Sequence, residues 1–163
     1  MSKKMISFHV PEDKDLLSAL GVLTLRHEHM NHILKMTIKS LARLTPEEAA
    51  HALRFEGSKS LRQRINILAK RELGEGKALL KLQSLLGRAG NLTDKRNNYV
   101  HGIWAKELDG DAGILDVPGE MTPLPTVPDL EKLGRDIEEL TIEINQARLD
   151  GWLKEAINSK SRV

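Results

Sequence analysis

Apolar residues recur every three or four positions along most of this chain, the spacing that places side chains on one face of an α-helix. After an irregular lead-in over residues 1–12, the first such stretch predicts a helix from about Asp13 to Arg43. The residues expected on its buried face are Leu16, Leu20, Leu23, His27, Met30, Leu34 and Leu41.

Start and stop signals divide the middle of the chain into two further helices. Thr45 and Glu48 can form a capping box around Pro46, which predicts a short helix ending near Arg54. A third helix is predicted over Ser58–Leu73, capped by its first residue. Its expected inward positions are Leu61, Ile65, Leu68 and Ala69.

A fourth helix follows Gly74 and Gly76. Gly90 could interrupt it, but a glycine inside a helix costs only about 1 kcal/mol, and the apolar spacing keeps its phase across that residue. We therefore predict one helix to about His101. Its expected buried face is Leu79, Leu82, Leu85, Leu86, Ala89, Leu92, Arg96 and Tyr99.

Gly102 ends the fourth helix, and the residues after it predict a small β-hairpin. Ile103–Leu108 and Ile114–Val117 are the expected strands, and the Asp- and Gly-rich residues 109–113 form the turn. Residues 118–128 hold four of the six prolines, so an extended loop is expected there.

Thr126 and Asp129 can cap a last helix, which is predicted to run to about Ile157. The whole pattern predicts an all-α fold in a single domain over residues 13–158. This domain is an antiparallel bundle of about five helices, with the hairpin and Pro-rich loop of residues 102–128 inserted before the last helix. The expected inward face of that helix is Leu130, Leu133, Ile137, Leu140, Ile144, Ala147 and Trp152.

Composition supports the helical prediction. The chain is 40% hydrophobic but only 3% aromatic, which favours an aliphatic helical core and disfavours a nucleic-acid surface of stacked rings. It has no cysteine, so neither a disulfide nor a thiolate metal site is expected. The N-terminal sequence MSKKMISFHVPEDKD has no long apolar run, and no window approaches 18 apolar residues. We therefore expect a cytoplasmic protein with no membrane segment.

The net charge of +2 hides an uneven distribution. Residues 54–96 contain eleven Lys/Arg against four Asp/Glu, whereas residues 107–155 contain thirteen Asp/Glu against four Lys/Arg. Such asymmetry is typical of a basic face for a polyanion, although solvated helix faces would give the same counts.

Arg96 stands on the apolar face of the fourth helix, where a charged side chain is costly unless it is paired. Either it meets a carboxylate inside the bundle, it lines a polar cavity, or it reaches outward from the edge of the stripe. Glu28, in the first helix, is the candidate carboxylate.

His101 shares a helix face with Asn97, four residues earlier. Arg96 is five residues before His101 and should point roughly 140° away from it. One chain is therefore not expected to aim both groups at one atom easily, whereas two chains around a two-fold axis could. The alternative for His101 is a histidine that interacts with the helix dipole and does nothing more.

Other chemistry has weaker support. His29 and His32 have a metal-chelating spacing, but no third ligand is evident, so no metal site is expected. The chain lacks GxGxxG, Walker and GxSxG motifs, and no cofactor is implied. The basic third helix leaves DNA binding open, although its apolar positions favour packing.

Residues 96–101 read R-N-x-x-x-H near the end of a long helix, followed by Gly102 and Trp104. This pattern resembles the HEPN domain, the higher-eukaryote and prokaryote nucleotide-binding superfamily. The resemblance covers roughly residues 13–157 and includes a long first helix with an internal Glu28. The hairpin and Pro-rich loop depart from minimal family members.

The resemblance implies a homodimer whose motif helices form one cleft, acting as a metal-independent ribonuclease or binding RNA or a nucleotide. In the ribonuclease case, His101 would exchange a proton with the RNA, Arg96 would hold the scissile phosphate, and Asn97 would orient either. Glu28 would fix Arg96, Tyr99 would pack, and Asn98 lies within the motif. A role in defence or toxin–antitoxin biology would add an antitoxin protein as partner.

Three functions therefore stay open. The chain could be an endoribonuclease, a non-catalytic RNA- or nucleotide-binding module, or a purely structural dimer in which Arg96 only pairs with Glu28.

Overall fold

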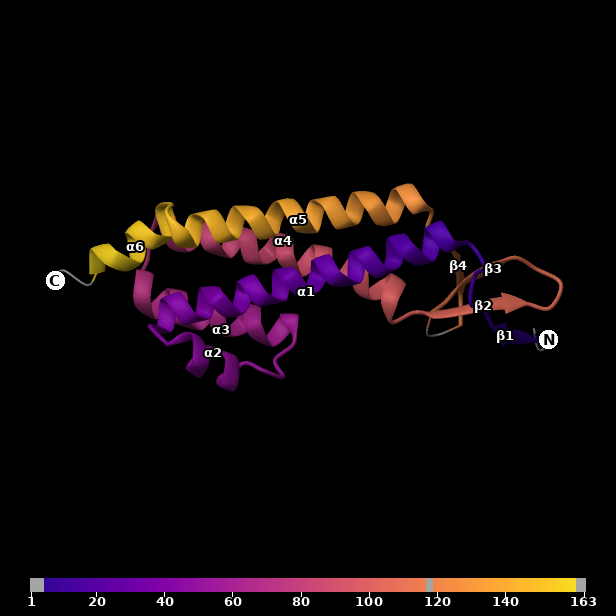
Figure 1. Cartoon of the computed structure of the whole chain (residues 1–163), viewed down its shortest axis with the longest axis horizontal. Coiled ribbons are helices and arrows are strands. Elements are labelled where there is room, and N and C mark those ends of the chain that lie inside the picture. The colour runs from indigo at the N-terminus through magenta and orange to yellow at the C-terminus, as the bar shows by residue number, and fades with distance from the viewer. Residues whose placement is uncertain (1–4, 117–118, 161–163) are drawn as a thin grey trace.

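A computed structural model describes residues 5–116 and 119–160 as an elongated helical bundle with a small antiparallel sheet at one end (Figure 1). Helices are α1 (Lys14–Ala42), α2 (Pro46–Ala52), α3 (Ser58–Leu73), α4 (Lys77–Val100), α5 (Val127–Leu149) and α6 (Trp152–Lys160). Strands are β1 (Ile6–Phe8), β2 (Ile103–Glu107), β3 (Ala112–Leu115) and β4 (Met121–Pro123). The fold is broadly helical, as predicted, but mixed rather than all-α.

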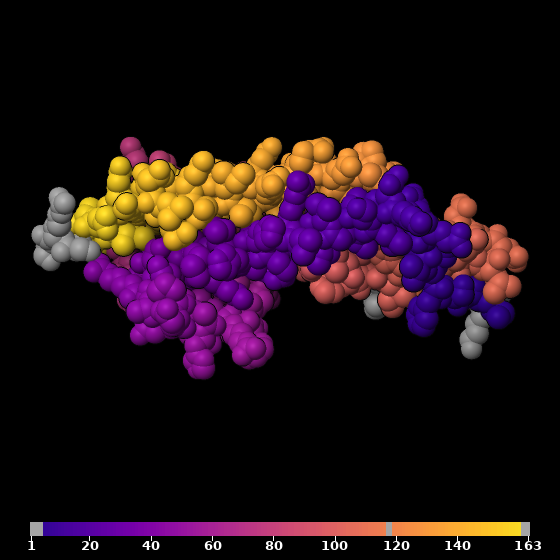
Figure 2. Space-filling view, viewed as in Figure 1, coloured from indigo at the N-terminus to yellow at the C-terminus, as the bar shows by residue number. Residues whose placement is uncertain are grey.

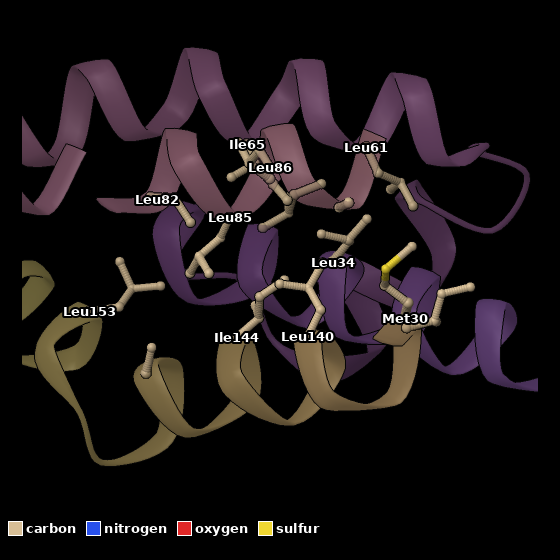
Figure 3. Close-up of a cluster of buried hydrophobic side chains, with 14 of the residues drawn as sticks. Met30, Leu34, Leu61, Ile65, Leu82, Leu85, Leu86, Leu140, Ile144 and Leu153 are labelled. Carbon is tan, nitrogen blue, oxygen red and sulfur yellow. The ribbon is translucent and has the colours of Figure 1, made fainter. Parts of the chain in front are cut away.

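One aliphatic core holds the bundle together. Met30 and Leu34 of α1 lie in it together with Leu140 and Ile144 of α5, and the apolar faces of α3 and α4 close over them (Figure 3). Most predicted inward residues are buried, while the following are half-buried: Leu20, Leu68, Leu92, Tyr99 and Trp152. Helix α4 runs without a break through Gly90, as the phase of its apolar positions predicts.

Capping residues start three of the helices. The Asp13 carboxylate accepts from the backbone N–H groups of Asp15 and Leu16 at the start of α1. Thr45 and Thr126 form the predicted capping boxes of α2 and α5. The predicted cap of α3 is wrong, because its N-cap is Gly57, and Ser58 is instead a buried helical residue.

The last predicted helix is two helices. Helix α5 ends at Leu149, and α6 begins at Trp152. Asp150 leaves the helical conformation at φ −147°, and a Cβ on Gly151 would lie 2.9 Å from the Ala147 Cα. The chain therefore turns too sharply here for the α5 hydrogen bonds to continue to Ile157.

The sheet is larger than the predicted hairpin. Its strand order is β1-β2-β3-β4, with every neighbouring pair antiparallel. Thus part of the lead-in 1–12 and part of the loop 118–128 are strands, while Val117 lies outside the described residues. The extra strands complete the backbone hydrogen bonds that an isolated hairpin leaves open at its two edges.

The sheet is fastened to the end of α4. The Trp104 indole N–H donates to the Tyr99 carbonyl at 2.7 Å, which joins β2 to the last turn of the helix. Gly102 lies between them, and a Cβ there would lie 2.3 Å from the Ile114 Cγ2 atom of β3. Helix and sheet therefore meet at the turn that carries His101. No helix of the described residues has the length and apolarity needed to cross a membrane.

Candidate anion-binding cleft

Arg96, Asn97 and His101 come together within one chain. The Arg96 side chain is 8% exposed, and its Nη1 donates to the Asn97 Oδ1 at 3.0 Å. The same Nη1 lies 3.2 Å from the His101 Nε2. The expectation that Arg96 and His101 diverge is therefore wrong. His101 is the C-cap residue beyond the last regular turn, and the long arginine side chain spans the remaining angle.

The contact between Arg96 and His101 fixes which imidazole nitrogen carries the proton. A guanidinium group has donors only, so the His101 Nε2 accepts and its proton lies on Nδ1. The His101 backbone N–H donates to the Asn97 carbonyl at 2.8 Å, which holds the residue at the end of α4. His101 is exposed at the rim of the cleft, whereas Arg96 lies at its floor.

The remaining motif residues lie on the sheet side of α4. Tyr99 packs against the core, and its carbonyl accepts from Trp104. Asn98 is exposed and lines a second pocket of about 710 Å³ between α4 and the sheet. Asn97 and His101 line this pocket as well as the cleft, so they form the boundary between the two hollows.

A buried network of side-chain hydrogen bonds lies behind Arg96. The Thr93 Oγ1 is 3.1 Å from the His27 Nε2 and 3.2 Å from the Ser58 Oγ. The Arg62 Nη1 donates to Ser58 at 2.6 Å and to Thr93 at 3.4 Å. The network joins α1, α3 and α4 at one level of the bundle.

Sequence analysis missed this network. Thr93 lies three residues before Arg96, so its place on the same face was readable from the spacing. The sequence predicts Ser58 as a helix cap, and Arg62 belongs to the basic third helix, for which DNA binding and packing both stay open. Only the packing of α3 against α4 brings these three hydroxyl and guanidinium groups together.

His27 takes part in the network as a neutral side chain. Burial, together with the positive charge of Arg96, lowers its pKa from 6.5 to about 4. Burial also lowers the pKa of Arg96 itself, while the Glu28 charge opposes that shift. The floor of the cleft thus combines a neutral imidazole with a desolvated guanidinium.

Stability is expected to fall as the pH drops from 6.5 to about 4. The unfolded chain takes up a proton on His27 first, because the pKa of this residue is lower in the folded state. The stabilisation is complete above pH 6.5 and amounts to about 3 kcal/mol. Urea unfolding at several pH values should show a flatter profile for His27→Gln over this interval. The exposed control His29→Gln should keep the parent slope, and an unchanged slope for His27→Gln would contradict the assignment.

Glu28 lies in the cleft but does not pair with Arg96. Its Oε1 accepts from the Asn31 Nδ2 at 3.3 Å and stands 3.9 Å from the His27 Nδ1. The ion pairs of residues 5–116 and 119–160 include none between Glu28 and Arg96. The predicted pairing is therefore not made in this structure, although the two charges influence each other.

These residues line a cleft of about 600 Å³ between α1, α3 and the end of α4. In the space-filling view, the surface is concave between helices α2 and α3 on one side and the sheet on the other (Figure 2). Three buried polar atoms of its lining residues have no hydrogen-bond partner: the His27 Nδ1, the Asn31 Oδ1 and the Arg96 Nε. Buried polar atoms are seldom left unsatisfied, which points to a ligand.

Arg62 and Arg96 give this cleft two guanidinium groups. Neither Arg62 nor Arg96 has a carboxylate within ion-pair distance among the described residues. A groove of similar volume between α1 and α5 has none of the unsatisfied buried atoms. Desolvated guanidinium groups without a paired carboxylate suit an anionic ligand, and His101 adds an imidazole at the rim.

The two candidate chelating residues His29 and His32 are exposed on α1 and do not line the cleft. The described part of the chain has no group of three His, Cys, Asp or Glu side chains suited to a metal ion.

Comparison of the chain with family models, with curated proteins and with solved structures gives no match.

Proposed function

We propose that this protein is a HEPN-like, metal-independent endoribonuclease. The observation that carries the proposal is Arg96, a guanidinium at the floor of an open cleft, bonded to Asn97 and His101 and to no carboxylate. A phosphodiester supplies the missing negative charge, and a ribose hydroxyl supplies the proton that His101 would exchange.

Each side chain has a defined task in this reaction. The RNA 2′-oxygen attacks the neighbouring phosphorus while its proton passes to His101. The bond from phosphorus to the 5′-oxygen breaks, and that oxygen takes up the proton that His101 now carries and leaves as a hydroxyl. Arg96 leaves the His101 Nε2 and turns its N–H groups to the phosphate, where charge increases in the transition state. Asn97, bonded to Arg96, orients the guanidinium for that movement.

The proposed assembly is a homodimer in which a second copy covers the exposed rim around His101. One chain already joins Arg96 to His101, so the second copy is proposed to enclose the RNA rather than to complete that pair. An antitoxin protein, if the chain acts as a toxin, would block the same rim.

A second candidate is a non-catalytic RNA- or nucleotide-binding module. It is favoured by the Arg96 contact with the His101 Nε2, because a nitrogen that accepts from a guanidinium is not free to take a proton. The cleft would then bind the phosphate without cutting the chain.

The test is RNA cleavage in EDTA by the parent, by His101→Ala and by the control His29→Ala. We expect the parent and His29→Ala to leave 2′,3′-cyclic phosphate ends. His101→Ala should be slower by a factor of about 10²–10⁴, the usual contribution of a general acid or base. Equal cleavage by all three proteins would overturn the role of His101. RNA binding without cleavage would favour the binding module, and neither binding nor cleavage would favour a structural dimer.

A further inference from the structure

Helix α3 begins inside the cleft with its backbone donors free of a side-chain cap. Its N-cap, Gly57, has no side chain to accept from them. The first N–H groups of an α-helix have no partner within the helix, and they carry a partial positive charge. Residues 57–60 line the cleft, so this donor-rich turn faces the same hollow as Arg96.

Arg62 adds a fixed positive charge one turn further along α3. Among the residues that the structure describes, its guanidinium bonds only to neutral hydroxyl groups, those of Ser58 and Thr93. Burial lowers the pKa of Arg62, and Asp94 counteracts this from beyond ion-pair distance. The Arg62 side chain packs over Gly90 of α4, where a Cβ would make an ordinary contact with the Arg62 Cζ at 3.5 Å.

Nearby acidic groups do not neutralise this end of the cleft. Glu56, just before α3, bonds to the Ser60 hydroxyl and pairs with Arg64 at 2.6 Å, and it does not line the cleft. Glu28 and Asp94 do line it, against the cations Lys59, Arg62 and Arg96.

The α1 and α4 sides of the cleft supply an independent sign of a ligand. His27, Asn31 and Arg96 are 3%, 7% and 8% exposed, and each has a polar atom without a hydrogen-bond partner. The Asn31 Oδ1 requires a donor, and the Arg96 Nε requires an acceptor. A phosphate next to a ribose hydroxyl offers both.

We infer that the first turn of α3, together with Arg62, is a second phosphate-binding site beside the Arg96–His101 pair. The Arg62 guanidinium contacts α4 at Thr93, and Arg96 is three residues further along the same helix. The two guanidinium groups therefore lie about one helical turn apart along α4. Two such groups suit neighbouring phosphates of one strand. The identification of that strand as RNA rests on the proposed function; the phosphate site itself does not.

Inorganic phosphate is the first probe. In an NMR titration of the ¹⁵N-labelled protein, the backbone amides of residues 58–60 should shift and saturate. Arg62→Gln should weaken this binding at least tenfold. The control Arg71→Gln removes the same charge from the far end of α3, where the side chain is 68% exposed and paired with Glu72, and it should bind like the parent. Unmoved amides in the parent, or equal binding by Arg62→Gln, would overturn the site.

A second variant covers the case in which Arg62→Gln does not fold. Lys59 is exposed at the mouth of the cleft, so Lys59→Gln should keep the parent spectrum and bind phosphate several-fold more weakly. Phosphate binding that is identical in Lys59→Gln and the parent would count against the site in the same way.

Binding of a 2′-O-methyl RNA, which cannot be cleaved through its 2′-oxygen, separates the two proposals. The slope of log affinity against log salt should be smaller in magnitude by about 0.7 in Arg62→Gln, as expected for one lost phosphate contact on a single strand. An unchanged slope would show that Arg62 does not contact a phosphate of the bound RNA. If the protein binds phosphate but cleaves no RNA, the phosphate site is supported and the proposed ribonuclease activity is wrong. If the protein cleaves RNA in EDTA but the amides of residues 58–60 do not shift with phosphate, the ribonuclease activity is supported and the phosphate site is wrong.

Discussion

Replacing Arg96 with methionine should strongly slow the proposed RNA cleavage and at the same time stabilise the protein. The guanidinium is 8% exposed and has no carboxylate partner among the described residues, so folding desolvates it with little compensation. Methionine fills a similar volume without a charge, and we expect the free energy of unfolding to rise by about 1–2 kcal/mol. Loss of a donor to the transition-state phosphate should slow cleavage by a factor of about 10²–10³.

Urea unfolding and cleavage assays in EDTA measure the two effects of Arg96→Met separately. The matched control is Arg88→Met on the same helix, where the side chain is half exposed and pairs with Glu143 at 2.7 Å. This surface pair should change the stability by less than about 1 kcal/mol and leave cleavage intact. A destabilised Arg96→Met protein that still cleaves RNA would identify Arg96 as a structural residue. Such a result would support the structural dimer.

Gly102→Ala should be the most damaging single-methyl addition at the site. The new Cβ would stand 2.3 Å from the Ile114 Cγ2 and 2.5 Å from the Asn98 carbonyl oxygen. A backbone carbonyl cannot turn away as a side chain can, so α4 and the sheet must separate. We expect the free energy of unfolding to fall by about 3 kcal/mol. Cleavage should fall as well, since His101 immediately precedes the displaced residue.

The control for Gly102→Ala is Gly87→Ala, which adds the same methyl group to α4 at a position with open space around it. There the substitution should raise the free energy of unfolding by about 1 kcal/mol through helix propensity. Denaturant unfolding of both variants gives the comparison. Equal stability of the two variants would mean that the junction between helix and sheet adapts to a side chain.

Helix spacing predicted the bundle and placed Arg96 on its apolar stripe, while a carboxylate partner, a polar cavity and the edge of the stripe stayed open for its side chain. A core needs apolar side chains at regular intervals, so a charged residue in that register must enter the core with them. The strongest feature of the site was therefore visible in the sequence. Gly90 did not interrupt α4, because its small cost is outweighed by the apolar contacts on either side.

The missed elements depend on contacts between segments that are distant in sequence. Strands β1 and β4 have three residues each, too few to show an alternating pattern, and they form by pairing with β2 and β3. The break between α5 and α6 lies at a tight turn at Gly151. The spacing of apolar residues continues across this turn and therefore does not predict it.

The site itself was half predictable. The motif named Arg96, Asn97 and His101, but the contact between Arg96 and His101 depends on the reach of their side chains, which the angle per residue does not give. Ser58 and Arg62 belong to α3, and their role depends on how that helix packs against Thr93. A periodic pattern shows which face is inward but not which neighbour it meets.

The pairing of β1 with β2 also sets an order on the folding of the chain. Ser7 and Lys106 pair although they are 99 residues apart, so the sheet closes a loop that contains α1, α2, α3 and α4. Closing so long a loop in an unfolded chain costs roughly 4 kcal/mol of entropy. A three-residue strand with exposed side chains returns little of that, so β1 joins only after the packed helices have brought the two ends together. Strand β1 is therefore expected to pair last, after the helices that line the cleft have packed.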